Sequence, residues 1–329
     1  MKLKHLILAI AAASCLQVHA ADSINLGSYS VAGTYALDIL NGDSGGISGL
    51  EASAVTYARD RGTLFFVGDE GTGVVEISLT GQTLGSMNFN WAGTGSSKHD
   101  TEGLTYLGGG VLVVGEERLQ DAYRFTYVAG GSATLANSGV SISNASVGNS
   151  GLEGISYDPR NGGSFVTIKQ ESPQNVMAGT LTFASGLGGI STMTELFNPT
   201  SMNLTTLSDI QTLSPVDKLV GTNAADNLLV LSLGSRMLVE VNRQGVVKSF
   251  LDLSGVVPNN GIEGVTVDEK GTIYLVAEQI QDGITLNTKS QLIVLTAPVP
   301  EPETYAMLLA GLGLLGFVAR RKKKIETAA

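Results

Sequence analysis

Four copies of one acidic motif are spread along the chain and could together bind a cation. The strict copies are TEGLTY at 101–106, LEGISY at 152–157 and IEGVTV at 262–267, and a looser copy, LEASAVTY, starts at residue 50. Carboxylates that a fold brings within about 6 Å of one another repel by roughly 3 kcal/mol per pair at an effective dielectric near 20. Protonation, intervening water or a bound cation must relieve that repulsion. Ligation of a metal ion by oxygen atoms is therefore the chemistry that these residues could perform.

The spacing of the acidic residues indicates a repeated architecture. Glu51, Glu102 and Glu153 are 51 residues apart, and Glu263 follows after a further 110. Half of that last interval predicts another copy near residue 208, where Asp209 stands in LSDIQTL. Short apolar runs bounded by Gly, Asn and Asp recur throughout, as expected for strands joined by tight turns. We therefore predict an all-β fold, a five-bladed β-propeller, with a six-bladed propeller as the alternative.

In a propeller, the first strand of each blade lines the central channel, so equivalent strand starts meet at one mouth. The predicted ring consists of Glu51, Glu102, Glu153, Asp209 and Glu263. The second strand of a blade returns to the same face, and GTLFFVGDE at 62–70 aligns without a gap with GTIYLVAEQ at 271–279. This alignment predicts a second tier beside the ring, made of Asp69, Glu117, Gln170, Asn223 and Glu278. The alternative is that all these residues are solvated strand ends whose identity survives from duplication.

The residue types favour calcium as the cation. Oxygen ligands from several strands suit this hard ion, whereas magnesium demands tight octahedral geometry and zinc prefers nitrogen and sulfur. Cys15 is the only cysteine of the chain, and His99 is the only histidine after residue 20. Arg118 and Lys169 follow the ends of second strands. They would either hold an anion near the metal or balance the charge of the ring.

The N-terminal residues and the net charge bear on location and partners. Residues 1–20 combine two lysines, an apolar run and Val-His-Ala before Ala21, a pattern typical of a secretory signal peptide. Residues 21–302 carry 13 Lys and Arg against 28 Asp and Glu, a net charge of about −15. Such a domain repels nucleic acid and anionic lipid surfaces, so we expect no nucleic-acid partner.

The C-terminal tail has three parts. Pro300, Glu301 and Pro302 precede an apolar run at 304–319 and five basic residues at 320–324. The apolar run is predicted to be a C-terminal transmembrane helix, with its basic end in the cytoplasm. The tail resembles the PEP-CTERM sorting signal, which an exosortase-type enzyme recognises and cuts, releasing the domain to the outer surface or the exterior. A plain membrane anchor is the alternative. The expected organisation is a signal peptide at 1–20, a propeller at 21–297 and a sorting segment at 298–329.

The propeller region also resembles a known family. EASAVTYARDRGTLFFVGDEGTGVVEIS, followed by DTEGLTYLGGGVLVVGEERLQDAYRF, is similar to the SdiA-regulated family of exported propellers. The resemblance spans residues 47–296, and its most specific parts are Asp100-x-Glu102-Gly103 and the Glu-Glu-Arg that ends at Arg118. It implies a five-bladed propeller, distantly akin to NHL-repeat proteins, with a calcium site. Ala52-Ser53 stands where the family usually has Ser-Gly, and the fourth unit is degenerate. These departures bear on the identity of individual ligands more than on the fold.

The expected function is that of an exported calcium-binding propeller acting as a cell-surface or matrix-associated binding module. An extracellular polysaccharide or a small molecule is the candidate ligand. The alternative is a metal-dependent hydrolase at the central channel, such as an esterase, a phytase-like phosphatase or a lactonase. That activity would need an open coordination position on the metal and a general base beside it.

Overall fold

The computed structural model describes residues 21–37, 47, 51–69, 71–143, 147–170, 173–279, 289–298, 309 and 311–315. The chain divides into two compact units, Met1–Thr296 and Ala297–Ala329. Within the described residues, no helix is long and apolar enough to cross a membrane. The predicted signal peptide, the sorting residues Pro300, Glu301 and Pro302, and most of the predicted transmembrane run lie outside the described residues.

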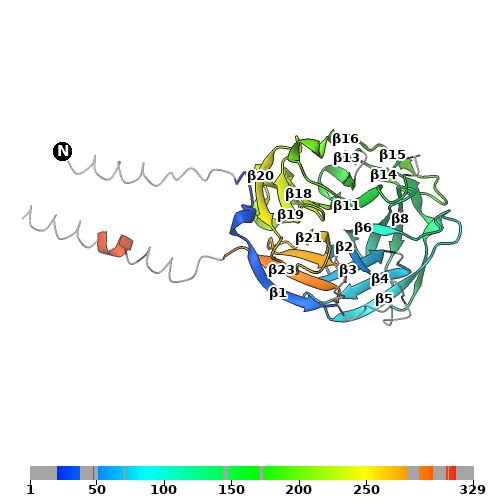
Figure 1. Ribbon diagram of the computed structural model, residues 1–329, viewed down its shortest axis with the longest axis horizontal. Coiled ribbons are helices and arrows are strands. Elements are labelled where there is room, and N and C mark those ends of the chain that lie inside the picture. Colours follow the sequence, from blue (N-terminus) through cyan, green and yellow to red (C-terminus); the bar gives the residue numbers. More distant parts are fainter. Residues whose placement is uncertain are drawn as a thin grey trace, which may run out of the picture. The chain divides into compact units, whose positions relative to one another are not determined.

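The first unit is a five-bladed β-propeller, as the motif spacing predicts, and not a six-bladed one (Figure 1). Its described strands form five antiparallel blades around a central channel, and each innermost strand begins at a copy of the acidic motif. The innermost strands are β2 (Glu51–Ala58), β6 (Thr101–Gly108), β11 (Leu152–Asp158), β17 (Leu207–Thr212) and β21 (Ile262–Val267).

The remaining strands of each blade follow outward from the channel. Blade one continues with β3 (Thr63–Asp69), β4 (Gly73–Ile77) and β5 (Thr83–Asn90), and blade two with β7 (Val111–Glu116), β8 (Asp121–Thr126) and β10 (Gly139–Ser141). Blade three continues with β12 (Ser164–Lys169), β13 (Asn175–Gly179) and β16 (Thr194–Phe197), and blade four with β18 (Leu228–Ser232), β19 (Met237–Val241) and β20 (Val247–Asp252). Blade five continues with β22 (Ile273–Ala277), β23 (Gln291–Thr296) and β1 (Ser30–Ala36).

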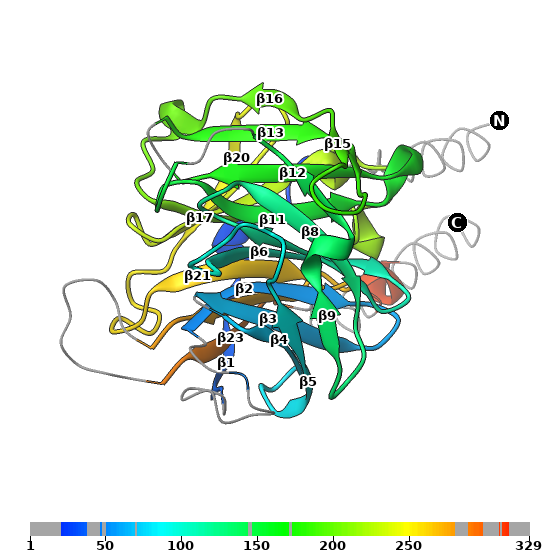
Figure 2. The same cartoon turned by 90° about the vertical axis from the view of Figure 1, so that its right-hand side faces the viewer.

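Short elements join or extend the blades. Strand β9 (Ser132–Thr134) runs parallel to β5 and adds a fifth strand to blade one (Figure 2). Strands β14 (Leu181–Thr182) and β15 (Ile190–Ser191) pair with each other. The 3₁₀ helices are η1 (Leu26–Ser28), η2 (Leu135–Asn137), η3 (Arg160–Gly162), η4 (Pro199–Met202), η5 (Asp217–Leu219) and η6 (Asn223–Asp226).

The ring closes with strands from the two ends of the unit. The sequence predicts that a strand within 26–40 pairs beside 291–295, and β1 does pair antiparallel with β23, which confirms this. Upstream of β1, the Ile24 backbone N–H donates to the buried carboxylate of Glu240 on β19 at 3.1 Å. Blade five is therefore completed by the N-terminal strand, and a propeller protects its sheet edges by such closure.

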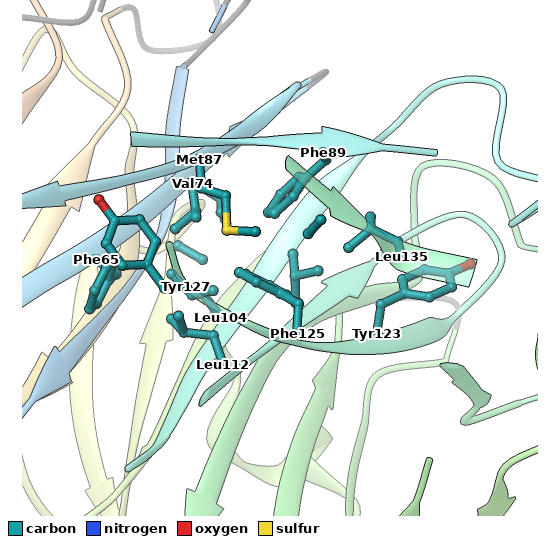
Figure 3. Packing of buried hydrophobic residues seen from close by; sticks show 14 of the residues in the cluster. Phe65, Val74, Met87, Phe89, Leu104, Leu112, Tyr123, Phe125, Tyr127 and Leu135 are labelled. Atoms are coloured by element: carbon teal, nitrogen blue, oxygen red, sulfur yellow. The ribbon is translucent and has the colours of Figure 1, made fainter. Parts of the chain in front are cut away.

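The hydrophobic core lies between neighbouring blades. Along β3, Phe65 and Val67 belong to the cluster packed against blade two, whereas Leu64 and Phe66 belong to the cluster packed against blade five. Figure 3 shows the cluster between blades one and two, in which Phe65 contributes an aromatic ring. Because such a strand is buried on both faces, it reads as a continuous apolar run in the sequence.

A ring of hydrogen bonds joins the five innermost strands and explains the hydroxyl of the repeated motif. The pairing register of each innermost strand skips one residue near its start, and three residues after the skipped one a hydroxyl or amide side chain contacts the neighbouring blade. The backbone N–H groups of Tyr57, Tyr106, Tyr157 and Thr212 donate to the side chains of Thr266, Thr56, Thr105 and Ser156 at 2.9–3.1 Å, and Thr266 Oγ1 donates to Gln211 Oε1 at 3.1 Å. We call these five side chains, at positions 56, 105, 156, 211 and 266, the hydroxyl ring.

Candidate acidic site at one mouth of the channel

Each innermost strand begins with a β-bulge that re-aims one side chain. The pairing register of every first strand skips a single residue near its start. A bulge adds a residue to one strand and turns it out of the regular alternation. The skipped residues are Ser53, Glu102, Glu153, Ser208 and Glu263. Three of the predicted glutamates are therefore structurally equivalent, and serines hold the equivalent positions in blades one and four.

The strand starts enclose a cavity of about 300 Å³ at one mouth of the channel. It is lined by the carboxylates of Glu51, Asp69, Asp100, Glu102, Glu117, Glu153, Glu263 and Glu278, together with Asn149, Thr206, Gln170 and Leu233. We call this set of eight carboxylates the acidic mouth. Four residues of the predicted second tier, at positions 69, 117, 170 and 278, follow or end second strands and line the cavity with the glutamates.

Three carboxylates from blades one and two come especially close. One oxygen of Asp69, one of Asp100 and one of Glu102 lie within 4.8 Å of one another. Asp69 ends β3, whereas Asp100 and Glu102 flank the first residue of β6. Asp100 also pairs with Arg118, with 2.5 Å between Oδ2 and Nε, and Arg118 donates in addition to Asn149. The guanidinium therefore contacts one member of the trio and offsets part of its charge.

Burial and mutual repulsion raise the pKa values of these carboxyls. Desolvation is the main cause of the raised pKa of Glu102, and the neighbouring Glu263 and Asp69 charges add to it. Burial likewise raises the pKa of Glu153, reinforced by Glu102 and Glu117, and that of Glu263, reinforced by Glu278. The same effect raises the pKa of Asp100 despite its contacts with Asp69 and Arg118. A bound cation would oppose these shifts, because a nearby positive charge favours the ionised form of a carboxyl.

The family follows from a match over most of the propeller. The model of the SdiA-regulated family matches residues 32–279. The chain belongs to the SdiA-regulated family. A second model, the PEP-CTERM protein-sorting motif, matches residues 298–323. That motif indicates export through a membrane-anchored precursor and processing by an exosortase-type enzyme.

Several solved structures show a distant similarity to this SdiA-regulated chain. Glutaminyl cyclase of Myxococcus xanthus is 12% identical, with a TM-score of 0.48 over 83% of this chain and 97% of the other. A luciferin-regenerating enzyme is 10% identical, with a TM-score of 0.48 over 80% and 95%. The PQQ-bound aldose sugar dehydrogenase of Streptomyces coelicolor is 10% identical, with a TM-score of 0.47 over 82% and 97%. At this level of likeness, these enzymes say nothing about the chemistry of the SdiA-regulated chain.

Asp209 does not line the acidic mouth, contrary to the predicted ring. Its side chain is buried and accepts hydrogen bonds from the backbone N–H groups of Ile210 and Val265, at 2.7 Å each. It stands one residue after the bulge of β17, at the position that Gly154 occupies in blade three. A Cβ on Gly154 would come within 2.4 Å of the Asp209 carboxylate, so that carboxylate fills the space beside the glycine. Asp209 therefore joins blades, and Ser208 is the true counterpart of the glutamates.

Asn223 is a second error of the predicted site. It begins η6, which precedes β18, so it lies at the opposite end of the blade from the acidic mouth. Its amide donates to Asp22 at 2.9 Å. The residue that follows β18 in the second-tier position is Leu233, which does line the cavity.

Glu51 and Lys169 take positions that the repeat did not foresee. Glu51 lines the cavity but stands two residues before the bulge residue Ser53, and it accepts a hydrogen bond from Gln279 at 2.8 Å. Lys169 ends β12 opposite Leu152 and is not among the residues that line the cavity. Aligning the looser motif copy on its hydroxyl, so that SAVTY matches EGLTY, is the sequence signal that would have found Ser53.

Proposed function

We propose that this SdiA-regulated propeller binds calcium at the acidic mouth and acts as a binding module at the cell surface or in the surrounding matrix. The observation that carries the proposal is the approach of Asp69, Asp100 and Glu102 to within 4.8 Å of one another. Five further carboxylates line the same cavity, and the Arg118 guanidinium contacts Asp100 of the trio. Such an excess of negative charge in a partly buried site favours a bound cation.

The donor set fits calcium better than other common ions. Calcium takes six to eight oxygen ligands in flexible geometry, and carboxylates from several blades can supply them. Asp69, Asp100 and Glu102 would hold the ion, with Glu263 and Glu117 close enough electrostatically to affect its affinity. The described lining of the cavity contains neither histidine nor cysteine, which disfavours zinc.

A hydrolase at the same cavity is the second candidate function. Carboxyls with raised pKa values, such as those of Glu102 and Glu153, are groups that can act as general acids or bases beside a metal. The one histidine of the described chain does not line the acidic mouth, because the His99 ring stacks on Trp91 with a centroid distance of 5.0 Å. An enzyme built on this site would therefore rely on carboxyls alone.

Calcium titration with thermal unfolding tests the proposed site. A hundredfold excess of calcium over its dissociation constant should stabilise the purified protein by about 2.7 kcal/mol, a shift of several degrees in Tm. Glu102→Gln keeps the side-chain shape, removes one ligand charge and should weaken calcium binding. Glu195→Gln, the same change at an exposed position of β16, is the matched control.

Three outcomes separate the candidates. If Tm is the same with chelator and with calcium, and is unchanged in Glu102→Gln, the acidic mouth is not a metal site. Calcium-dependent cleavage of ester, phosphate or lactone substrates, lost in Glu102→Gln, would favour the hydrolase. Calcium binding without such cleavage would support the binding module.

Release from the membrane tests the proposed location. In a host with an exosortase-type enzyme, the domain should appear outside the cell without its tail. Replacing Pro300, Glu301 and Pro302 by alanines should leave the protein in the membrane fraction. Unchanged release of that variant would show that the motif does not direct processing.

A further inference from the structure

The opposite mouth of the channel holds a larger cavity, of about 580 Å³. Its residues come from the far ends of the innermost strands and from the turns that follow them, whereas the acidic mouth is built from the strand starts. Tyr57, Tyr106 and Tyr157 line it from three consecutive blades. We call this cavity and its residues the tyrosine mouth. Its volume lies within the roughly 300–1,000 Å³ that is usual for small-molecule sites.

The floor of the tyrosine mouth is neutral and polar. Thr56, Thr105, Gln211 and Thr266 of the hydroxyl ring line it, and all four are buried. Thr56 and Thr105 each accept a backbone hydrogen bond, which uses one lone pair of a hydroxyl that also carries a proton to donate. A ligand that reaches this floor therefore meets groups that hydrogen-bond but carry no charge.

The charges at the rim are engaged with protein groups. Arg59 pairs with Asp217 at 2.9 Å, and Asp60 accepts a hydrogen bond from the Gly109 backbone N–H at 3.0 Å. Glu269 lies against Tyr57 and, after burial, is the main cause of the raised pKa of that phenol. The carboxylates of Asp60 and Glu269 in the lining would repel an anionic ligand, and the guanidinium of Arg59 at the same rim would repel a cation. The lining therefore favours a neutral ligand.

We propose that the tyrosine mouth binds a neutral carbohydrate. A sugar ring has apolar C–H faces and a hydroxyl-bearing edge. The tyrosine rings can pack against the apolar faces, and the threonine hydroxyls and the Glu269 carboxylate can hydrogen-bond with the hydroxyl groups at the edge. The inference extends the proposed binding role by naming a ligand class, and it rests on that role but not on calcium.

Ligand-observed NMR on the purified protein tests the proposal. The probes are cellotetraose, maltotetraose and chitotetraose, with galacturonate as the charged comparison. We expect saturable binding of at least one neutral probe and none of galacturonate. Tyr106→Leu should weaken that binding roughly tenfold, since it removes an aromatic wall, and Tyr106→Phe should largely retain it. Tyr35→Leu, on β1 and outside the cavity, is the matched control for lost ring packing.

Further variants keep the test decisive. If Tyr106→Leu fails to fold, Glu269→Gln keeps the shape of the mouth and should weaken binding several-fold by removing a charged acceptor. Chelator and Glu102→Gln should leave sugar binding unchanged. A negative result for calcium binding at the acidic mouth can therefore be told apart from a negative result for sugar binding at the tyrosine mouth. The proposal is overturned if no neutral probe binds, if binding survives both mouth variants, or if binding follows calcium and Glu102 instead.

Discussion

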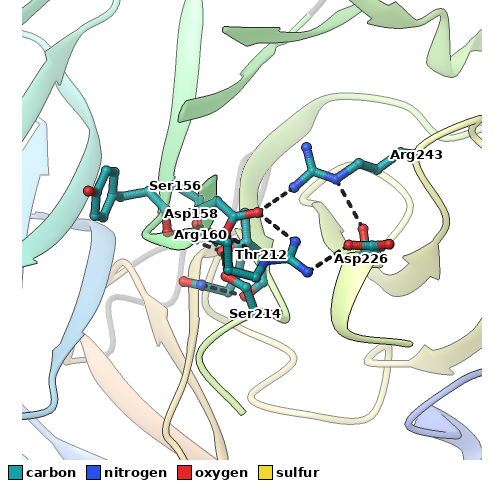
Figure 4. A network of polar contacts seen from close by, with 9 residues as sticks. Ser156, Asp158, Arg160, Thr212, Ser214, Asp226 and Arg243 are labelled. Atoms are coloured by element: carbon teal, nitrogen blue, oxygen red, sulfur yellow. Dashed lines mark hydrogen bonds and ion pairs between the residues drawn. The ribbon is translucent and has the colours of Figure 1, made fainter. Parts of the chain in front are cut away.

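Buried carboxylates at the two ends of the innermost strands lie in opposite electrostatic environments. At the acidic mouth, Glu153 is buried among other carboxylates, and its pKa is raised. At the opposite end of the innermost strand of blade three, Asp158 is the last residue of β11 and is also buried, but it lies between two guanidinium groups (Figure 4), with Arg160 at 2.7 Å and Arg243 at 2.8 Å. Although burial alone would raise it, the hydrogen bonds from Arg160 hold the pKa of Asp158 below its usual value.

This difference shows that depth of burial does not decide what a carboxylate does. A carboxylate with an internal cation holds the fold together, as Asp158 does by joining blades three and four through Arg243. A carboxylate without one is an unsatisfied charge that an external cation can serve. The acidic mouth is a candidate cation site because eight carboxylates gather there, with the Arg118 guanidinium in contact with one of them.

Removing the internally paired carboxylate should have the largest effect. Asp158→Ala removes the buried carboxylate that Arg160 and Arg243 share, although both keep contacts with Asp226, and should lower the free energy of unfolding by about 3 kcal/mol. Urea denaturation of the purified protein measures this. A loss below 1 kcal/mol would show that the arginines are satisfied in other ways, and Asp158 would then differ less from the acidic-mouth carboxylates than its contacts indicate.

The pH dependence of stability should have opposite signs for the acidic mouth and for Asp158. The raised pKa values of Glu102, Glu153 and Glu263 mean that, without metal, their contribution is fully present below about pH 4.5 and is lost as the pH rises through the folded-state values. The expected loss is on the order of 1–2 kcal/mol. The lowered pKa of Asp158 contributes stability that is lost as the pH falls.

Melting curves with chelator and with calcium, between pH 4 and pH 8, separate the two contributions. Calcium should abolish the loss on the alkaline side, since it binds the deprotonated carboxylates. The acid-side loss should persist with calcium and should shrink in Asp158→Asn. A metal-free protein that gains stability up to pH 8 would contradict the assignment of raised pKa values to the acidic mouth.

Neutralising one acidic-mouth carboxylate should stabilise the metal-free protein. Glu102→Gln relieves repulsion from Glu263 and Asp69 and should raise the free energy of unfolding by about 1 kcal/mol at pH 7 in chelator. With saturating calcium, the same variant should be less stable than the parent chain. Destabilisation under both conditions would mean that Glu102 serves packing and not ligation.

The smallest effect should come from the exposed pair at the rim of the tyrosine mouth. Arg59 and Asp217 are each 57% exposed, so water and salt screen their attraction. Arg59→Ala should therefore change the free energy of unfolding by no more than about 0.5 kcal/mol. A larger loss would indicate that this pair helps to hold blades one and four together.

Much of the fold follows from the sequence because duplication copies whole blades. The repeat of Glu, small residue, aliphatic and hydroxyl marks β6, β11 and β21 correctly, and their glutamates do meet. The closing strand is predictable because a propeller needs its first and last blades joined. These inferences depend on period and topology, which survive changes of individual residues.

The errors in the predicted site residues arise because sequence spacing does not reveal a β-bulge or a longer connection between strands. Equal spacing selects Glu51, although the bulge of β2 makes Ser53 the counterpart of Glu102. In blade four, the connection between β17 and β18 contains η5 and η6, so the second strand starts after Asn223 and not before it. The pairing of Asp158 with Arg243 was also beyond reach, since 85 residues separate the two partners.

The closure of blade five determines where a mechanical load enters the domain. Strand β23 ends at Thr296, and the chain runs from there directly into the segment that carries the sorting motif. β23 is also the strand that lies between β22 and the N-terminal β1, hydrogen-bonded to both. Tension on the tail is therefore borne by two ladders at once, one of them made with the opposite end of the domain. In a precursor anchored by its tail, the load acts on β23, where the ring closes. Detaching this strand requires its hydrogen bonds to both β22 and β1 to break.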